Sequence, residues 1–528
     1  MMKMMRSPVS LFALNIVLTL YLFALNLFSN HGMVEIQAAV WPALVLLALG
    51  WLLALVHRWP FKLFWTLNLL AGSVAVFAKS QYRILITEDI LLSALISEND
   101  LTAEMISVKS VCFVLVFGLL PVLLLWRQRI RQVGWRRHLA CCGLASLAAL
   151  LAVFGLFQYK DYHFRGKGSI RDSRFMGDVL RFSPLDVYYN GQRARKSVRD
   201  MKRNYAGVER MPQKYRYLDQ KDDLLVVFVI GESTRGDRFS LNGYPRNTNP
   251  QLAAIPNLYS FKNAQSCDTL TVNSLNCLSS PMLKSSPRQS SFGEVFRSLG
   301  YRSEIYSLQT LSGFYSYMGY DRLVSKYQIV AEQQSGAWDA ALLPYMRQSV
   351  AQYRGGKMLL VLHTLGSHQT YADRIPPHHR VFTPYCTNPD VSHCSKAELD
   401  NAYDNTVLGV DELLAETIKS LSDKRALLIY VSDHGESLGE NGDYFHGKPV
   451  NIAPKEQFSI PFVVWFSESY RQSPEGKVLA ERVAQAVKDG RAVSHDNIFH
   501  TVLGCAGITS PDGGIDSHLD ICAADTGN

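Results

Sequence analysis

Four side chains beyond residue 222 combine metal ligands with a hydroxyl nucleophile: Glu232, Thr271, Asp433 and His434. A hydroxyl is a poor nucleophile at neutral pH, but coordination to a divalent cation removes its proton and orients the oxygen for attack on phosphorus. This ligand set suits zinc, although an oxygen-rich set also accepts manganese or magnesium. The alternative is that the carboxylates cap helices and the histidine is a buried packing residue. Metal-assisted group transfer is the interpretation that uses all four residues.

Apolar runs directly before these residues predict the strands that position them. Leu224 to Ile230 ends beside Glu232, and Ala426 to Val431 ends beside Asp433. A third run, Met358 to Leu362, precedes a loop that contains two histidines. Such runs are typical of parallel strands buried on both faces, and ligands bind beyond the carboxyl ends of these strands.

Further strands alternate with helical patterns over residues 223–528. Two more strands and three helices are predicted at Tyr301 to Leu308 and Ile460 to Phe466, and at Ser291 to Leu299, Ser395 to Ser420 and Val478 to Lys488. This alternation indicates one large α/β domain, with a mainly parallel sheet that helices cover on both faces.

The first 158 residues are predicted to form a transmembrane domain of five helices. The five apolar stretches are Leu11 to Phe28, Ile36 to Val56, Leu63 to Ala78, Ser110 to Trp126 and Leu139 to Phe157. Each is roughly long enough to cross a hydrocarbon core of ~30 Å, the third only marginally, with Lys62 and Lys79 reaching the interfaces. A cleaved signal peptide is the alternative for the first stretch, but no small-x-small site follows Phe28.

Basic residues are concentrated in alternate connections between these stretches, most densely from Arg127 to Arg137. The positive-inside rule therefore places the N-terminus in the cytoplasm, and five crossings place residues 223–528 outside. Residues 159–222 form a basic juxtamembrane bridge, either against anionic lipid head groups or as a solvated linker. The net charge of +8 owes much to this bridge and the cytoplasmic loops. Because no nucleic-acid reader motif is present, no nucleic-acid partner is expected.

The six cysteines of the exported domain fall into close pairs: Cys267 with Cys277, Cys386 with Cys394, and Cys505 with Cys522. An oxidising compartment permits disulfides between them. Six cysteines allow many connectivities, so nearest-neighbour pairing is a hypothesis, and reduced buried cysteines are its alternative.

Several longer motifs surround the candidate residues. They are Gly231 to Arg235, Gly243 to Thr248, Ser266 to Thr271, His363 to His368, Ser432 to Ser437 and Thr509 to Gly514. In these motifs the chain resembles the periplasmic phosphoethanolamine transferases of Gram-negative bacteria. The resemblance covers the whole chain, because the family has five membrane helices, a bridge and an alkaline-phosphatase-like (sulfatase-like) domain.

The resemblance implies a zinc ion bound by Glu232, Thr271, Asp433 and His434. Thr271, rather than Thr269, matches the threonine that accepts phosphoethanolamine. A second zinc, or a dependence on manganese, magnesium or calcium, stays open.

His368 and His446 resemble the family's histidines near the donor phosphate, with Glu436 as their neighbour. There they can stabilise negative charge, protonate the leaving group or help to bind a second metal. Many members also carry an asparagine and a lysine for the donor head group, whereas this chain has Gln309 and Phe314 nearby, so those roles are not assigned here.

The implied reaction is a two-step transfer from phosphatidylethanolamine to lipopolysaccharide through a phosphothreonine. Residues 266–269 and 510–514 are most similar to the members that modify Kdo in the inner core. A multi-pass protein of the bacterial inner membrane, monomeric and with its catalytic domain in the periplasm, is expected. The alternatives are transfer to a lipid A phosphate or heptose, phosphoglycerol transfer to a periplasmic glycan, ester hydrolysis, and a lipid sensor with an inert site.

Two other histidine-containing segments are expected to have no ligand role. His378, His379 and His393 lie in a polar loop and are expected to be solvated. His495, Asp496, Asn497 and His500 precede an apolar helix-like stretch, where capping and packing are expected.

Overall fold

The computed structural model describes residues 10–29, 36–82, 86–96, 107–130, 135–164, 182–206, 214–218, 223–281, 290–333, 338–388 and 390–524. By internal contacts the chain divides into two units, Met1–Leu92 with Ile106–Lys196, and Ser93–Met105 with Ser197–Asn528. The predicted bridge, residues 159–222, is shared between the two units. Its residues 165–181, 207–213 and 219–222 lie outside the described residues.

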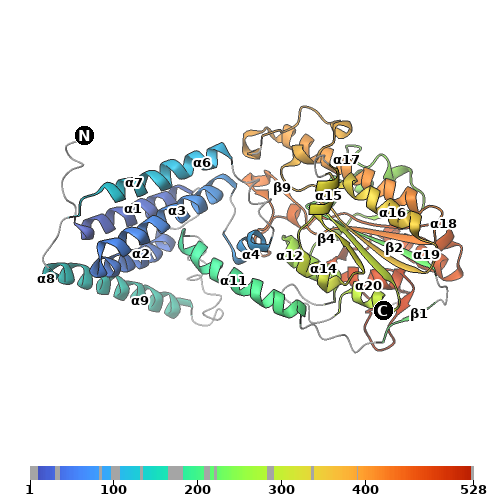
Figure 1. The fold of residues 1–528 in the computed structure, drawn as a ribbon, viewed down its shortest axis with the longest axis horizontal. Coiled ribbons are helices and arrows are strands. Elements are labelled where there is room, and N and C mark those ends of the chain that lie inside the picture. The colour runs from blue at the N-terminus through green and yellow to red at the C-terminus, as the bar shows by residue number, and fades with distance from the viewer. Residues whose placement is uncertain are drawn as a thin grey trace. The chain divides into compact units, whose positions relative to one another are not determined.

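Apolar helices make up most of the described part of the first unit (Figure 1). They are α1 (Leu11–Ser29), α2 (Ile36–Val56), α3 (Arg58–Tyr82), α6 (Val108–Val114) continued by η2 (Leu115–Leu119) and α7 (Leu120–Arg127), and α8 (Trp135–His138) continued by η3 (Leu139–Gly143) and α9 (Leu144–Phe164). Among the described residues, four of these helices are long and apolar enough to cross a membrane, and α1 contributes a shorter apolar segment, Leu11–Leu27. Helices α4 (Glu88–Ile96) and α11 (Leu185–Ala206) begin in this unit and end in residues assigned to the second.

Helix α3 is longer than the predicted stretch from Leu63 to Ala78, because the two lysines that seemed to end it lie inside the helix. Lys62 Nζ donates to Trp126 O at 3.2 Å. Lys79 Nζ lies 2.5 Å from Asp186 Oδ2, and both side chains are buried. A buried lysine is tolerated when its charge is paired or hydrogen-bonded, so these lysines do not have to reach an interface.

A seven-stranded sheet forms the centre of the second unit, in the order β3-β11-β8-β2-β7-β5-β6. The strands are β3 (Leu258–Phe261), β11 (Phe462–Phe466), β8 (Ala426–Ser432), β2 (Leu224–Gly231), β7 (Lys357–His363), β5 (Arg302–Ser307) and β6 (Arg322–Val324). The prediction of a mainly parallel sheet is confirmed, with β11 as the exception because it pairs antiparallel with both β3 and β8.

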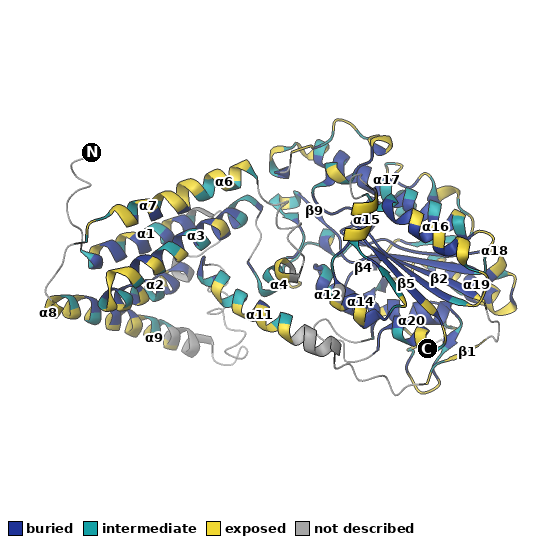
Figure 2. Ribbon diagram, in the orientation of Figure 1, coloured by how far each residue is buried: buried dark blue, intermediate teal, exposed yellow. Residues whose placement is uncertain are grey.

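Helices cover both faces of this sheet (Figure 1). They are α12 (Thr271–Ser279), α13 (Phe292–Ser298), α14 (Ser312–Met318), α15 (Lys326–Gln333), α16 (Leu343–Gln352), α17 (Lys396–Leu421), α18 (Glu468–Arg471), α19 (Pro474–Lys488) and α20 (His495–Cys505). Short strand pairs lie outside the sheet: β1 (Arg216–Tyr217) with β13 (Ile508–Thr509), β4 (Ala264–Gln265) with β12 (Val493–Ser494), and β9 (Ser437–Leu438) with β10 (Tyr444–Phe445). Figure 2 shows the central strands buried, as their unbroken apolar runs require.

The cysteines of the second unit form the three nearest-neighbour disulfides, Cys267–Cys277, Cys386–Cys394 and Cys505–Cys522. The first of these joins α12 to the loop before it, and α12 begins at Thr271. This disulfide therefore restrains the segment that carries the candidate nucleophile.

We expect Cys267→Ser/Cys277→Ser to lower the free energy of unfolding by roughly 2–4 kcal/mol, because the unfolded chain regains the freedom that the cross-link removes. The measurement is thermal unfolding of the purified protein in detergent. Cys112→Ser, which changes an exposed free thiol, is the control and should leave the transition unchanged. Equal transition temperatures for the double variant and the unmodified protein would contradict this expectation.

Candidate active site

The register of the sheet brings the predicted ligands together at one edge. In the parallel pair of β2 and β8, Gly231 lies opposite Ser432, so Glu232 and Asp433 leave the sheet side by side. Strand β7 runs parallel to β2 on its other side and ends at His363. Ligand sites of open α/β sheets lie at this edge, beyond the carboxyl ends of the strands.

Thr271, the first residue of α12, lies beside these strand ends. Thr271 Oγ1 donates to Glu232 Oε2 at 3.2 Å and lies 3.2 Å from His434 Nε2. The same His434 nitrogen lies 3.2 Å from Asp433 Oδ2 and 3.5 Å from Glu232 Oε1. Glu232, Asp433 and His434 are buried, whereas Thr271 is half-buried. The hydroxyl is therefore the group of this cluster that a substrate can reach.

The donor atoms of this cluster fit a divalent cation. Asp433 Oδ1 accepts hydrogen bonds from the amides of Ser233 and His434, at 3.0 and 2.7 Å. Its buried Oδ2 takes no hydrogen bond of good geometry from any residue that the structure describes. His434 Nδ1 lies 2.9 Å from Gly435 O. A carbonyl only accepts, so Nδ1 carries the proton and Nε2 presents its lone pair to the cluster.

The electrostatics of the cluster also favour a cation. Burial, followed by the neighbouring Asp433 carboxylate, raises the pKa of Glu232 well above its ordinary value. Burial also opposes ionisation of Asp433, but the nearby His434 and hydrogen bonds lower the pKa of Asp433 overall. Burial lowers the pKa of His434, which favours the neutral ring that binds metals. Two adjacent buried carboxylates are costly without a compensating positive charge, which a metal ion supplies.

The turn after β2 directs Glu232 into the site. Ser233 has φ 54°, a left-handed conformation that costs a non-glycine residue about 1 kcal/mol or more. Asp433 Oδ1 accepts from its amide, and Tyr403 Oη donates to its carbonyl at 2.6 Å. Gly366 approaches so closely that a Cβ atom there would lie 2.2 Å from Glu232 O. The strained turn is thus fixed by contacts from three other segments.

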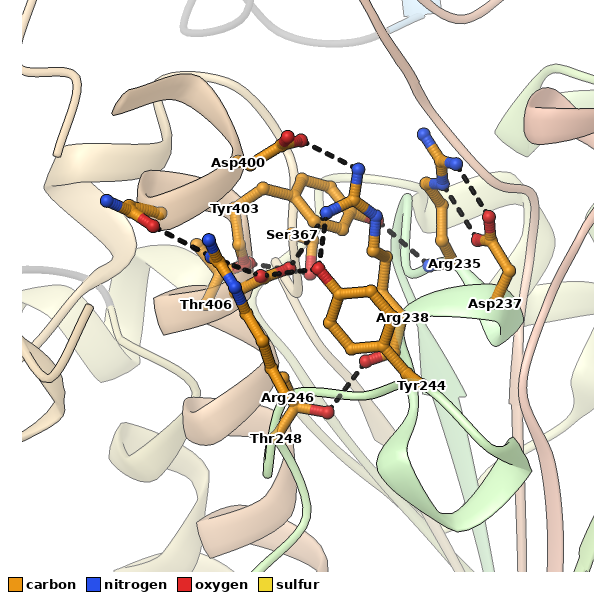
Figure 3. A network of polar contacts seen from close by, with 12 residues as sticks. Arg235, Asp237, Arg238, Tyr244, Arg246, Thr248, Ser367, Asp400, Tyr403 and Thr406 are labelled. Carbon is orange, nitrogen blue, oxygen red and sulfur yellow. Dashed lines mark hydrogen bonds and ion pairs between the residues drawn. The ribbon is translucent and has the colours of Figure 1, made fainter. Parts of the chain in front are cut away.

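The loop that follows this turn is fastened to α17 by charged side chains (Figure 3). Arg238 Nη2 lies 2.7 Å from Asp400 Oδ1. The buried carboxylate of Asp404 accepts from Tyr244 Oη and from Arg246 Nη1, each at 2.8 Å. The motif from Gly243 to Arg246 therefore holds this loop on α17 through contacts within the protein.

A second row of residues lies beside His434. The imidazole rings of His434 and His446 have centroids 4.2 Å apart, and that of His368 lies 5.5 Å from His446. Glu436 connects this row, because its Oε2 is 2.7 Å from His446 Nδ1 and its Oε1 accepts from Tyr371 Oη at 2.9 Å. Burial alone would lower the pKa of His446, but the Glu436 carboxylate raises it above the ordinary value. The structure thus brings together all the residues predicted from the sequence for this site.

Gln309, to which the sequence assigned no role, lies at this site. Its Nε2 donates to Glu232 Oε2 at 3.1 Å and to Thr364 O at 3.0 Å. Phe314, by contrast, is buried in the hydrophobic core. Gln309 therefore orients a candidate metal ligand, a contact that only the folded chain creates.

We expect Gln309→Leu to weaken zinc binding roughly 10–100-fold, because partners that orient metal ligands typically contribute that much affinity. Competition against a chromophoric chelator measures this change. Gln485→Leu is the matched control. The Gln485 side chain lies on the exposed face of α19, and the hydrogen bond that the structure gives it is to the Asp489 carboxylate. Unchanged zinc affinity in Gln309→Leu would show that this amide does not hold the ligand.

Two further segments with histidines were expected to have no ligand role. His495 is buried, with Nε2 2.9 Å from Ser432 O and Nδ1 accepting from the Cys267 amide, while Ser494 and Asn497 form a capping box. The prediction of solvated histidines is wrong for His379. Its side chain is 10% exposed and packs against the Glu412 carboxylate, because its loop is docked on α17.

Residues 225–508 match the sulfatase family, and residues 43–172 match a family described as phosphoethanolamine transferase EptA/EptB. The second unit therefore has the sulfatase-like α/β fold. The chain is 32% identical over 522 residues to the Kdo(2)-lipid A phosphoethanolamine 7''-transferase of Escherichia coli (strain K12), which covers 93% of this chain and 90% of that protein.

Two further similarities extend over most of the chain. Phosphoethanolamine transferase EptA of Helicobacter pylori (strain ATCC 700392 / 26695) is 29% identical over 467 residues, 87% of this chain and 83% of that protein. The structure of the integral membrane protein lipooligosaccharide phosphoethanolamine transferase A (EptA) from Neisseria meningitidis aligns with a TM-score of 0.79, at 26% identity and 98% coverage of both chains.

Proposed function

Because the chain belongs to the phosphoethanolamine transferase family, we propose that it transfers phosphoethanolamine from phosphatidylethanolamine to a Kdo sugar of lipopolysaccharide, through Thr271. The observation that carries the proposal is the position of Thr271 Oγ1, 3.2 Å from both Glu232 Oε2 and His434 Nε2. The acceptor is inferred from the Kdo(2)-lipid A transferases of Escherichia coli and Salmonella typhimurium, which are similar over 93% of the chain.

The proposed cofactor is one zinc ion held by Glu232, Thr271, Asp433 and His434. This assignment is supported by Asp433 Oδ2, which accepts no hydrogen bond of good geometry from the described residues, and by the lone pair of His434 Nε2. When bound, zinc would lower the pKa of the threonine hydroxyl and balance the charge of the two carboxylates.

The chain's own residues supply orientation and protons. Thr271 Oγ1 gives its proton to Glu232 Oε2, to which it already donates, and forms a bond to phosphorus. The bond from phosphorus to the diacylglycerol oxygen breaks at the same time, and that oxygen takes up a proton. His446 is the proposed source of this proton. Its Nδ1 contacts the Glu436 carboxylate, and His368 lies beside it. Thr271 opens α12, and the amino end of a helix favours the negative charge of a phosphate. In the second step an acceptor hydroxyl attacks the phosphorus and gives its proton to His446, while the bond from phosphorus to Thr271 Oγ1 breaks. Thr271 Oγ1 takes its proton back from Glu232 and returns to its free form.

The proposed topology has five membrane helices within residues 1–158, a bridge at 159–222 and the catalytic domain at 223–528. Helix α1 has 19 residues, which at 1.5 Å per residue span about 28 Å, close to a hydrocarbon core of ~30 Å. A monomer in the bacterial inner membrane, with the catalytic domain in the periplasm, would give Thr271 access to two substrates that both reside in membranes.

Mass spectrometry of lipopolysaccharide from cells that express the chain tests the proposed function, with Thr271→Ala cells alongside. Fragmentation of the core locates any added phosphoethanolamine. Addition to Kdo that depends on Thr271 is the expected result. Addition to a lipid A phosphate or a heptose would show that Kdo is not the acceptor. No addition by an expressed, zinc-loaded protein would overturn the proposal.

A further inference from the structure

A cluster of potential metal ligands lies outside the active site, where His378 and His379 meet Glu412 of α17. His379 Nε2 lies 2.9 Å from Glu412 Oε2, and His378 Nε2 lies 3.1 Å from the same oxygen. One ligand atom from each residue can be chosen so that all three lie within 4.8 Å of one another. The two adjacent histidines belong to a single turn, η10 (Pro377–His379).

The donor set of this cluster is suited to zinc. Two imidazoles and one carboxylate form a familiar three-ligand zinc site, whose fourth position is taken by water. Ligand atoms bound to one tetrahedral ion at ~2.0–2.1 Å are about 3.3 Å apart, and the two separations between imidazole nitrogen and carboxylate oxygen, 2.9 and 3.1 Å, are only slightly shorter. The His378 side chain is 58% exposed and that of His379 only 10%, so the cluster opens to solvent on one side.

The cluster continues a row of contacts that docks the segment after His368 onto α17. Asn405 bonds to the backbone of Phe382 through both atoms of its amide, and Asn401 Nδ2 donates to Pro384 O at 2.7 Å. Asn401, Asn405 and Glu412 are four and seven residues apart, which places them on one face of the helix. Glu412 is thus the next anchor in this row.

The docked segment also reaches the active site. It begins at Ser367 and includes His368 and Tyr371, and the Tyr371 hydroxyl donates to Glu436 Oε1. Thr406 of α17 holds the start of the segment by donating to Ser367 Oγ at 2.8 Å. A cation bound by His378 and His379 would restrain the middle of the segment, between Ser367 and the contacts at Phe382 and Pro384.

We propose that His378, His379 and Glu412 bind a second zinc-type divalent ion, at a site separate from the Thr271 centre, which fastens the segment from Ser367 to Cys386 onto α17. In the simpler alternative both imidazoles only donate hydrogen bonds to the carboxylate, and no ion is bound.

Zinc titration of the full-length protein in detergent, in competition with a chromophoric chelator, distinguishes a bound ion from hydrogen bonds alone. We expect the unmodified protein to bind one more zinc ion per chain than His378→Ala, whose exposed side chain can be removed without opening the core. Glu412→Gln should lose the same ion. Because two different substitutions then give the same loss, a folding defect in one variant does not explain the result. His393→Ala, at an exposed position, and Glu416→Gln, at a half-buried position on the same helix as Glu412, are matched controls and should retain it.

Asp433→Asn separates this site from the proposed catalytic zinc. It should lose the ion of the Thr271 centre and keep the one at His378, His379 and Glu412. Zinc stoichiometry that is equal in the unmodified protein, His378→Ala and Glu412→Gln would overturn the second site. Loss of both ions in His378→Ala would show that the two positions are not independent sites, and would also overturn it.

Discussion

Thr271→Ala is expected to abolish phosphoethanolamine transfer, with a loss in kcat on the order of 10⁴–10⁶-fold, as for other enzymes that lose a covalent nucleophile. Thr271 is the hydroxyl that contacts both Glu232 and His434, and alanine leaves no oxygen to attack phosphorus. Release of diacylglycerol from a fluorescent phosphatidylethanolamine by purified protein in detergent measures the first step.

Two further variants make this result specific. Thr271→Ser restores a hydroxyl at the same position and should recover measurable transfer. Thr269 is the neighbouring threonine, but its hydroxyl donates to Lys448 O at 2.6 Å and makes no recorded contact with the ligand cluster. Thr269→Ala should therefore lose far less activity than Thr271→Ala. The reverse order would assign the nucleophile to Thr269.

Asp433→Asn is expected to remove the metal with little change to the surrounding backbone. The amide oxygen of asparagine can still accept from the Ser233 and His434 amides, as Asp433 Oδ1 does. Only the bare Oδ2 and its charge are lost. We expect zinc affinity at this centre and kcat/KM each to fall by at least about 100-fold, since even indirect partners of metal ligands contribute 10–100-fold.

Thermal unfolding gives a second readout of the same variant. Zinc that binds the folded protein raises its transition temperature, so this increase should be reduced in Asp433→Asn. Asp423→Asn, at an exposed carboxylate, is the control. Full activity and zinc affinity in Asp433→Asn would exclude this residue as a ligand.

The parts of the fold that local sequence patterns determine were predictable. Unbroken apolar runs identified β2, β7 and β8. Glu232 and Asp433 each come two residues after one of these runs, so their place at the edge of the sheet was predictable as well. The cysteine pairs were predictable because short separations in an exported domain favour local disulfides. Motifs shared with a known family added His368, His446 and Glu436.

Features that depend on contacts between distant segments were not predictable. An apolar run does not encode strand direction, so the antiparallel course of β11 was missed. Gln309 lies 77 residues from Glu232 in the chain, and no spacing rule connects them. His379 was expected in solvent because its loop is polar, yet docking on α17 buries it. These cases share one cause, since each partner is brought in by the sheet or by α17.

The mass of the peptide that contains Thr271 tests the central proposal most directly. Purified protein is incubated with phosphatidylethanolamine that carries an isotopic label in its ethanolamine, and is then digested and fragmented. The account predicts labelled phosphoethanolamine on Thr271, which disappears when Kdo-containing lipopolysaccharide is added. A label on another residue, or release of diacylglycerol with no label on Thr271 at any time, would contradict it.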